Sequence, residues 1–126
     1  MPVPFFPVVL ADSTVQGDLD LNVKGDSQVW PEWLIKGPGE DVLIENDYGD
    51  QIFIEGTVNS IIRIVTEPQR QAIRDEDGLI WGRVPVGQDV MFPLLPGKNH
   101  VKLSMVNGSP QSSITVSWRE NWKAGL

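Results

Sequence analysis

The chain has 126 residues, a formal net charge of −7 at pH 7 and no cysteine. A chain of this length encloses a single apolar core, so we expect one domain spanning residues 1–126. The missing cysteines exclude a disulfide framework and a thiolate metal site. The acidic balance argues against nucleic acid and anionic lipid as partners, because both repel a negatively charged protein.

The first residues, MPVPFFPVVLAD, are apolar but carry no basic leader and are too short to span a bilayer. We therefore expect neither an export signal nor membrane insertion. Pro4 and Pro7 have no backbone N–H to donate to a central strand ladder. Residues 1–12 are accordingly predicted to form an edge strand or an arm that reaches a neighbouring subunit.

Apolar and polar residues alternate with a period of two along most of the remaining chain. In residues 17–26, GDLDLNVKGD, leucine and valine share one face while aspartate and asparagine share the other, as in a half-buried antiparallel strand. No stretch sustains an apolar stripe with helical spacing. Further strands are predicted at residues 33–36, 42–46, 51–55, 60–66, 69–74, 89–92, 99–105 and 112–118.

Glycine and proline gather in the connections, as in KGPGED (36–41) and LPGKN (95–99). NGS at 107–109 matches a glycosylation sequon, but Asn-Gly between two alternating runs is a hairpin signal, and we interpret it as a turn. Short strands about 8 to 12 residues apart favour a sandwich, because each sheet must cover its apolar face. The sequence therefore predicts an all-β fold, a two-sheet antiparallel β-sandwich.

The acidic residues and the single histidine carry no recognisable catalytic pattern. His100 is expected on the outward face of its strand, and a catalytic imidazole needs an orienting carboxylate and a nucleophile in a sheltered site. Acidic pairs and runs at 40–41, 45–50 and 75–77 lie in predicted turns, where carboxylates cap backbone amides. Sequence spacing alone does not bring two of them together as a glycosidase pair.

Two short runs resemble binding loops only in part. DLDLN at 18–22 mimics the opening of a calcium loop, but Val23 stands where the sharp-turn glycine belongs and no glutamate closes the loop. We interpret it as the solvated face of a strand. KGPGED lacks the spacing of a phosphate-binding loop. We therefore predict a non-enzymatic protein that needs no metal and no other cofactor.

Five tryptophans are the one feature that points to a ligand or a partner. Alternation places Trp33 and Trp118 on the buried faces of their strands. Exposed aromatic rings stack on sugars and also anchor subunit interfaces, so packing, an interface and sugar stacking all remain open for the others. Four aromatic residues fall in or beside predicted turns, namely Trp30, Trp81, Trp122 and Tyr48.

Three segments, read in order, resemble the C-terminal domain of siphovirus-type distal tail proteins, a family of phage minor tail proteins. They are VKGDSQVWPEWLIKGPG (23–39), IIRIVTEPQRQAIRDEDG (61–78) and FPLLPGKNHVKLSM (92–105) running into SITVSWRENW (113–122). The matching positions are Gly25, Asp26, Pro31, Trp33, Ile35, Gly37 and Pro38 in the first segment, Glu67 in the second, and Pro96, Gly97, Asn99, Trp118, Arg119 and Trp122 in the third. Their order and spacing, rather than any one motif, carry the resemblance.

The resemblance implies a jelly-roll sandwich, galectin-like or carbohydrate-module-like, at a phage tail tip. Distal tail proteins form a hexameric ring there, between the tail tube and the host-recognition apparatus. The resemblance also implies that the Pro96-Gly97 turn aligns two core strands with residues 113–118 as their partner, so that this stretch completes the fold and lines no pocket. Such proteins carry an N-terminal ring-forming domain, so this chain is expected to be an excised domain or a shorter relative.

The sequence thus predicts a structural component of a bacteriophage tail tip, located in the virion and assembled in the host cytoplasm. It would present sandwich surfaces to other phage tail proteins or to further copies of itself. The alternative is a carbohydrate-binding module that recognises host cell-surface glycans. That alternative requires two exposed aromatic residues on one concave face, because the fold alone does not decide between the two functions.

Overall fold

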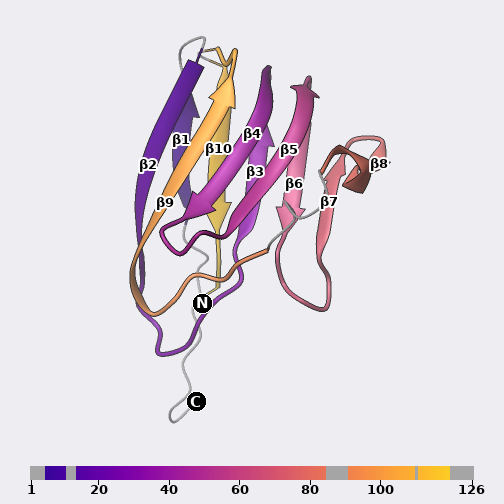
Figure 1. The fold of residues 1–126 in the computed structure, drawn as a ribbon. Coiled ribbons are helices and arrows are strands. Elements are labelled where there is room, and N and C mark those ends of the chain that lie inside the picture. The colour runs from indigo at the N-terminus through magenta and orange to yellow at the C-terminus, as the bar shows by residue number, and fades with distance from the viewer. Residues whose placement is uncertain (1–4, 11–13, 85–90, 110, 120–126) are drawn as a thin grey trace.

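The computed structural model describes residues 5–10, 14–84, 91–109 and 111–119. One set of strands comprises β1 (Phe5–Leu10), β3 (Glu32–Lys36), β6 (Ile61–Val65), β7 (Ala72–Asp75), β8 (Gly78–Leu79) and β10 (Ser112–Ser117). The other comprises β2 (Thr14–Val23), β4 (Gly39–Asn46), β5 (Gln51–Val58) and β9 (Gly97–Val106). Every strand pair is antiparallel, and the two sets form two sheets that lie face to face (Figure 1). The predicted all-β sandwich is confirmed.

Strand order differs from chain order in both sheets. The six-stranded sheet has the order β1-β10-β3-β6-β7-β8, and the four-stranded sheet has the order β2-β9-β4-β5. The chain crosses from one sheet to the other at most of its early and late connections (Figure 1). β1 pairs only with β10 and lies at a sheet edge. Residues 1–4 and 11–12 of the predicted arm lie outside the described residues.

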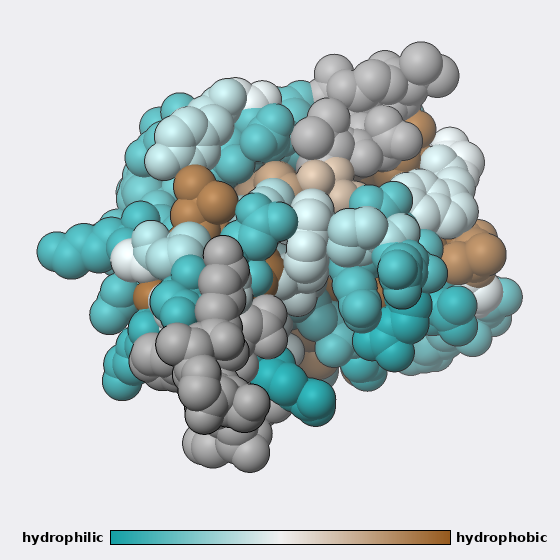
Figure 2. Space-filling model, turned by 90° about the horizontal axis from the view of Figure 1, so that it is seen from below, coloured by the Kyte–Doolittle hydropathy of each residue, from teal (hydrophilic) through white to brown (hydrophobic). Residues whose placement is uncertain are grey.

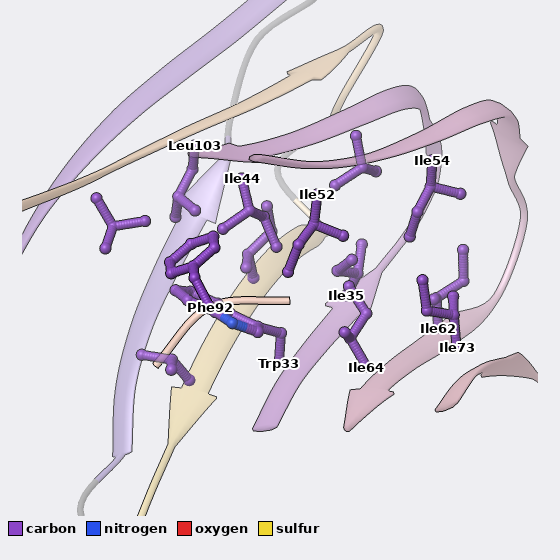
Figure 3. Close-up of a cluster of buried hydrophobic side chains, with 14 of the residues drawn as sticks. Trp33, Ile35, Ile44, Ile52, Ile54, Ile62, Ile64, Ile73, Phe92 and Leu103 are labelled. Carbon is purple, nitrogen blue, oxygen red and sulfur yellow. The ribbon is translucent and has the colours of Figure 1, made fainter. Parts of the chain in front are cut away.

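The core fills the space between the two sheets (Figure 3). Alternate residues point inward in strands such as β3, β9 and β10, so the period-two pattern becomes two facing apolar layers. Trp33 and Trp118 are 0% and 3% exposed, as their parity predicted. Each fully buried large apolar side chain contributes about 1.5–3 kcal/mol, so this layer dominates stability. The largest buried side chains are Trp33, Phe92, Leu21, Ile35, Ile44, Ile52, Ile54, Ile62, Ile64, Ile73 and Leu94.

β9 and β10 follow each other in the chain but lie in different sheets, so their predicted pairing is wrong. β9 is paired with β2 on one side and β4 on the other, while β10 lies between β1 and β3. Because both sides of β9 are occupied, β10 cannot pair with it, and β10 is found in the opposite sheet. Asn107 adopts a left-handed φ of 56°, so a turn is present as predicted, but it is no hairpin turn because the strands that it joins do not pair with each other.

Two predicted strands are shortened or absent. Residues 68–70 form a turn, closed by the Arg70 N–H donating to the Glu67 carbonyl at an N–O distance of 2.9 Å, so β7 begins only at Ala72. Of the predicted strand 89–92, residues 91 and 92 lie in no strand, and 89 and 90 lie outside the described residues.

Residues 91–96 cross the end of the sandwich instead of joining a sheet. Pro93 has no N–H for a ladder, and the segment makes a single bridge in which Leu94 and Val29 exchange backbone hydrogen bonds of 2.8 and 2.9 Å. Phe92 and Leu94 are both 1% exposed. The apolar run that resembled a strand therefore closes the core at this end.

Glu40 and Asp41 lie within β4, not in a turn as predicted. The β4–β5 register shifts between Glu40 and Val42, and Asp41 adopts a φ of 51° at this bulge. The Asp41 Oδ1 accepts a hydrogen bond from the Gly56 N–H at 2.8 Å. Its carboxylate thus caps a backbone amide, as expected, but at an irregularity inside the sheet.

The outer edge of β5 is covered by a side chain from the 3-10 helix η1 (Trp81–Arg83). The Arg83 Nε donates to the Glu55 carbonyl at 2.9 Å, and its Nη2 donates to the Thr57 carbonyl. β5 is the last strand of its sheet, so these carbonyls point away from the ladder. Arg83 occupies acceptors that an added strand would need.

Candidate functional site

The aromatic residues predicted as site candidates do not gather at one place. Tyr48 lies in the β4–β5 turn and is 76% exposed. Trp30 is half-buried beside the start of β3, whereas Trp81 packs against the core from η1. Trp122 lies outside the described residues. Among the residues that the structure describes, two exposed aromatics do not share a concave face.

A cleft of about 430 Å³ opens at the end of the sandwich where β4 ends and β9 begins, and we term it the Tyr48 cleft. One wall is the turn 46–50, the other is residues 98–101, and residues 92–95 form the floor. Asp20 of β2 completes the rim. The expectation that residues 92–105 line no pocket is therefore wrong. Figure 2 views this end of the molecule, where patches of hydrophobic residues are exposed between hydrophilic ones.

The first wall is a turn organised by Asn46. Its Oδ1 accepts hydrogen bonds from the N–H groups of Tyr48 and Asp50, both at 2.9 Å. Its Nδ2 donates to the Asp50 Oδ2 at 3.2 Å, and its N–H donates to the Asp50 carbonyl at 3.0 Å. Such side-chain bonds to nearby backbone fix a tight turn. Tyr48 is therefore held at the tip of a braced loop.

The second wall begins with a turn organised by Asn99. The Leu95 N–H donates to the Asn99 Oδ1 at 2.8 Å, and the Asn99 Nδ2 donates back to the Leu95 carbonyl at 2.8 Å and to the Gly97 carbonyl at 3.1 Å. A longer contact of 3.4 Å joins the same Nδ2 to the Leu21 carbonyl on β2. Gly97 adopts a φ of 91°, which side-chain-bearing residues rarely adopt. The Pro-Gly-Lys-Asn sequence thus sets the shape of this wall.

His100 links the two walls and also contacts β2. Its Nδ1 lies 2.9 Å from the Asp47 Oδ1, and its Nε2 lies 3.2 Å from the Asp18 Oδ1. Both ring nitrogens must donate to satisfy both carboxylates, which requires the imidazolium form. The hydrogen bond to Asp47, aided by the charges of Asp47, Asp18 and Asp20, holds the pKa of His100 above its usual value of 6.5. His100 is on the outward face as predicted, but its carboxylate partners were not foreseen.

A second cleft, of about 500 Å³, lies at the end of the six-stranded sheet and is termed the Trp30 cleft. Trp30 and Trp118 line it together with the charged side chains of Glu67, Arg70 and Arg119. The Arg70 Nε and the Glu67 Oε2 form an exposed ion pair at 3.0 Å. Exposed pairs of this kind add about 0–1 kcal/mol, so this pair contributes little to stability.

The sequence contained part of the signal for the Tyr48 cleft. Parity alone places Asp18 and Asp20 on the outer face of β2, and His100 on the outer face of β9. The missing fact was the register, which sets Asp20 directly opposite His100. Which strands pair depends on how the chain crosses between the sheets, and the register of β2 with β9 can be assigned only once that pairing is known.

Other kinds of site find no support in the described part of the chain. It contains no group of three or more histidine, aspartate or glutamate side chains placed to hold a metal ion. It also contains no helix of the length and apolar character needed to cross a membrane. In comparisons with protein-family models, curated proteins and solved structures, the chain has no match.

Proposed function

We propose that this domain is a non-enzymatic structural component of a bacteriophage tail tip that presents rigid sandwich surfaces to neighbouring tail proteins. Its place is the virion, and its assembly takes place in the host cytoplasm. The proposal starts from the three segments that resemble distal tail proteins. It is supported by the contacts that those three segments make with one another in the fold.

The three segments form one contiguous framework. β3 from the first segment pairs with β6 from the second and with β10 from the third. Thr66 donates from its hydroxyl to the Pro31 carbonyl at 2.5 Å, and Leu94 bridges to Val29. A set of motifs whose members contact one another is more informative than three isolated matches. This mutual contact is the observation that carries the proposal.

The matching residues serve the fold more than the surface. Trp33 and Ile35 are fully buried, and a side chain at Gly37 would overlap the Val58 carbonyl. Asn99 braces its turn through backbone hydrogen bonds. Such a framework holds its outer surface rigid, which suits a protein whose role is contact. The surface itself then determines which neighbour is bound.

The Trp30 cleft is the surface that we assign to this contact. Tryptophan and arginine are among the residues most enriched at interface anchors, and the cleft combines the half-buried Trp30 with Arg70 and Arg119. A single well-packed anchor contributes about 2 kcal/mol or more to an interface. We expect a neighbouring tail subunit, or a further copy of the chain, to insert a side chain beside Trp30.

Labelling of intact particles tests the assignment. Phage particles that carry the encoding gene are treated with gold-labelled antibodies against the domain and viewed by negative-stain electron microscopy. Gold at the distal end of the tail is expected. Gold on the capsid, or an absence of the domain from purified particles, would overturn the proposal.

Complementation of a gene deletion tests the surface. Trp30→Ala should lower the yield of complete tails about ten-fold or more, as expected for the loss of an anchor. Ile61→Ala, which truncates an exposed apolar residue at the start of β6, is the matched control and should support normal yield. A normal yield with Trp30→Ala would remove the Trp30 cleft from the interface.

A further inference from the structure

We propose that the Tyr48 cleft is a binding site for a neutral saccharide unit, separate from the surface that contacts tail proteins. The ring of Tyr48 would stack on the sugar, while Asp20 and Lys98 would bond its hydroxyl groups. The inference goes beyond the structural role and does not depend on it. It also places sugar recognition at a single aromatic, not at the pair that the sequence led us to expect.

The exposed apolar surface supports a ligand at this position. Tyr48 is 76% exposed and Leu95 is 36% exposed, and both line the cleft. They are two of four large apolar residues exposed to this degree among the described residues. Exposed aromatic and aliphatic groups that converge on a hollow mark binding sites more often than isolated ones do.

The volume and rigidity of the cleft suit a small ligand. Its volume of about 430 Å³ falls within the range of about 300–1,000 Å³ found for small-molecule sites. Asn46 braces one wall and Asn99 braces the other, and the His100–Asp47 contact joins them. A site that is already ordered avoids the entropy cost of ordering on binding.

The polar groups of the cleft match sugar hydroxyls. Asp20 and Lys98 are exposed, and their side chains make no hydrogen bond or ion pair within the described part of the chain. The carboxylate offers acceptors and the ammonium group offers donors. A hydroxyl group is both donor and acceptor, so adjacent sugar hydroxyls can satisfy both. The apolar C–H face of the sugar ring then lies against the aromatic ring of Tyr48.

The charge balance selects against acidic sugars. Asp20, Asp47 and Asp50 line the cleft, against Lys98 and the imidazolium of His100. The carboxylates outnumber the cations, so a uronic acid or a phosphorylated sugar is repelled. An arginine or lysine side chain of a partner protein would match the carboxylates but would meet Lys98 and His100. A neutral saccharide has neither conflict.

The test begins with an array of neutral and acidic glycans probed with the intact chain. The best neutral binder is then titrated into ¹⁵N-labelled protein, and amide shifts are followed by NMR. We expect saturable shifts at Tyr48, Gly49 and Asn99. Tyr48→Ala should weaken binding about ten-fold or more, and Tyr48→Phe, which keeps the stacking face, should retain it.

The outcomes separate this proposal from the structural one. Trp30→Ala should leave saccharide binding unchanged, and Tyr48→Ala should leave tail assembly unchanged. Absence of any binder on the array, shifts that map away from the cleft, or undiminished binding by Tyr48→Ala would overturn the proposal. So would saturable binding of N-acetyl-arginine amide at Tyr48 without binding of a neutral glycan, since that result assigns the cleft to a basic protein side chain.

Discussion

Replacement of Asn99 by alanine should destabilise the domain more than its half-exposed position suggests. Three of its hydrogen bonds are 2.8, 2.8 and 3.1 Å long, and the contact with Leu21 at 3.4 Å is weak. A hydrogen bond contributes about 0.5–1.5 kcal/mol net, and water can replace part of the bonding of exposed backbone groups. Three bonds near the low end of that range give about 2 kcal/mol.

Urea unfolding followed by tryptophan fluorescence measures this loss, because Trp33 and Trp118 are buried in the native state. For a domain of this size, a loss of about 2 kcal/mol lowers Tm by roughly 6–10 °C. Asn99→Asp should be no better than Asn99→Ala, since a carboxylate keeps the acceptor but faces two carbonyl groups. Asn22→Ala removes an exposed asparagine from β2 and is the matched control. If Asn99→Ala lies within about 0.5 kcal/mol of that control, the bracing role of Asn99 is wrong.

Two further predictions concern backbone packing and pH. Gly37→Ala should lower the free energy of unfolding by about 1–3 kcal/mol or more, because the new Cβ would overlap the Val58 carbonyl. At Gly82 a Cβ meets open space, so Gly82→Ala is the control and should change the free energy of unfolding by less than about 0.5 kcal/mol. Equal effects of the two substitutions in urea unfolding would contradict the packing argument. The raised pKa of His100 means that its bond to Asp47 stabilises the fold fully below pH 6.5 and that this contribution is lost as pH rises through the raised pKa. The stability advantage of the wild type over His100→Gln should therefore shrink between pH 5.5 and pH 9, and a difference that stays constant with pH would rule out this ionisation.

The fold class could be predicted because it depends on local pattern. Alternation of apolar and polar residues specifies strands, and it placed Trp33 and Trp118 correctly in the core. Glycine and proline marked most connections correctly. Both signals act over a few residues, where sequence and conformation are directly coupled.

Strand partners could not be predicted, because they depend on contacts between distant residues. The Asn107 turn has the sequence of a hairpin, yet β9 pairs with β2 and β4, and the strand after the turn joins the opposite sheet. The apolar run that ends at Phe92 resembles a strand but closes the end of the sandwich. In both cases the prediction that the apolar residues are buried was correct, and the predicted position of the segment in the sheets was wrong.

The cleft beside Tyr48 could not be predicted for the same reason. Tyr48 was identified as exposed, but the cleft beside it is formed by β2, β9 and the β4–β5 turn together. His100 contacts Asp47 and Asp18, which lie 53 and 82 positions away in the chain. A contact between residues so far apart in the sequence can be predicted only when the pairing and register of the strands are known.

Arg83 has a consequence for how copies of this domain can associate. A strand from another molecule that approached β5 would first have to displace a guanidinium group from two main-chain oxygens. The β5 border is therefore shielded from fibre-like addition of a further strand, and copies of the domain held side by side are less prone to join their sheets there.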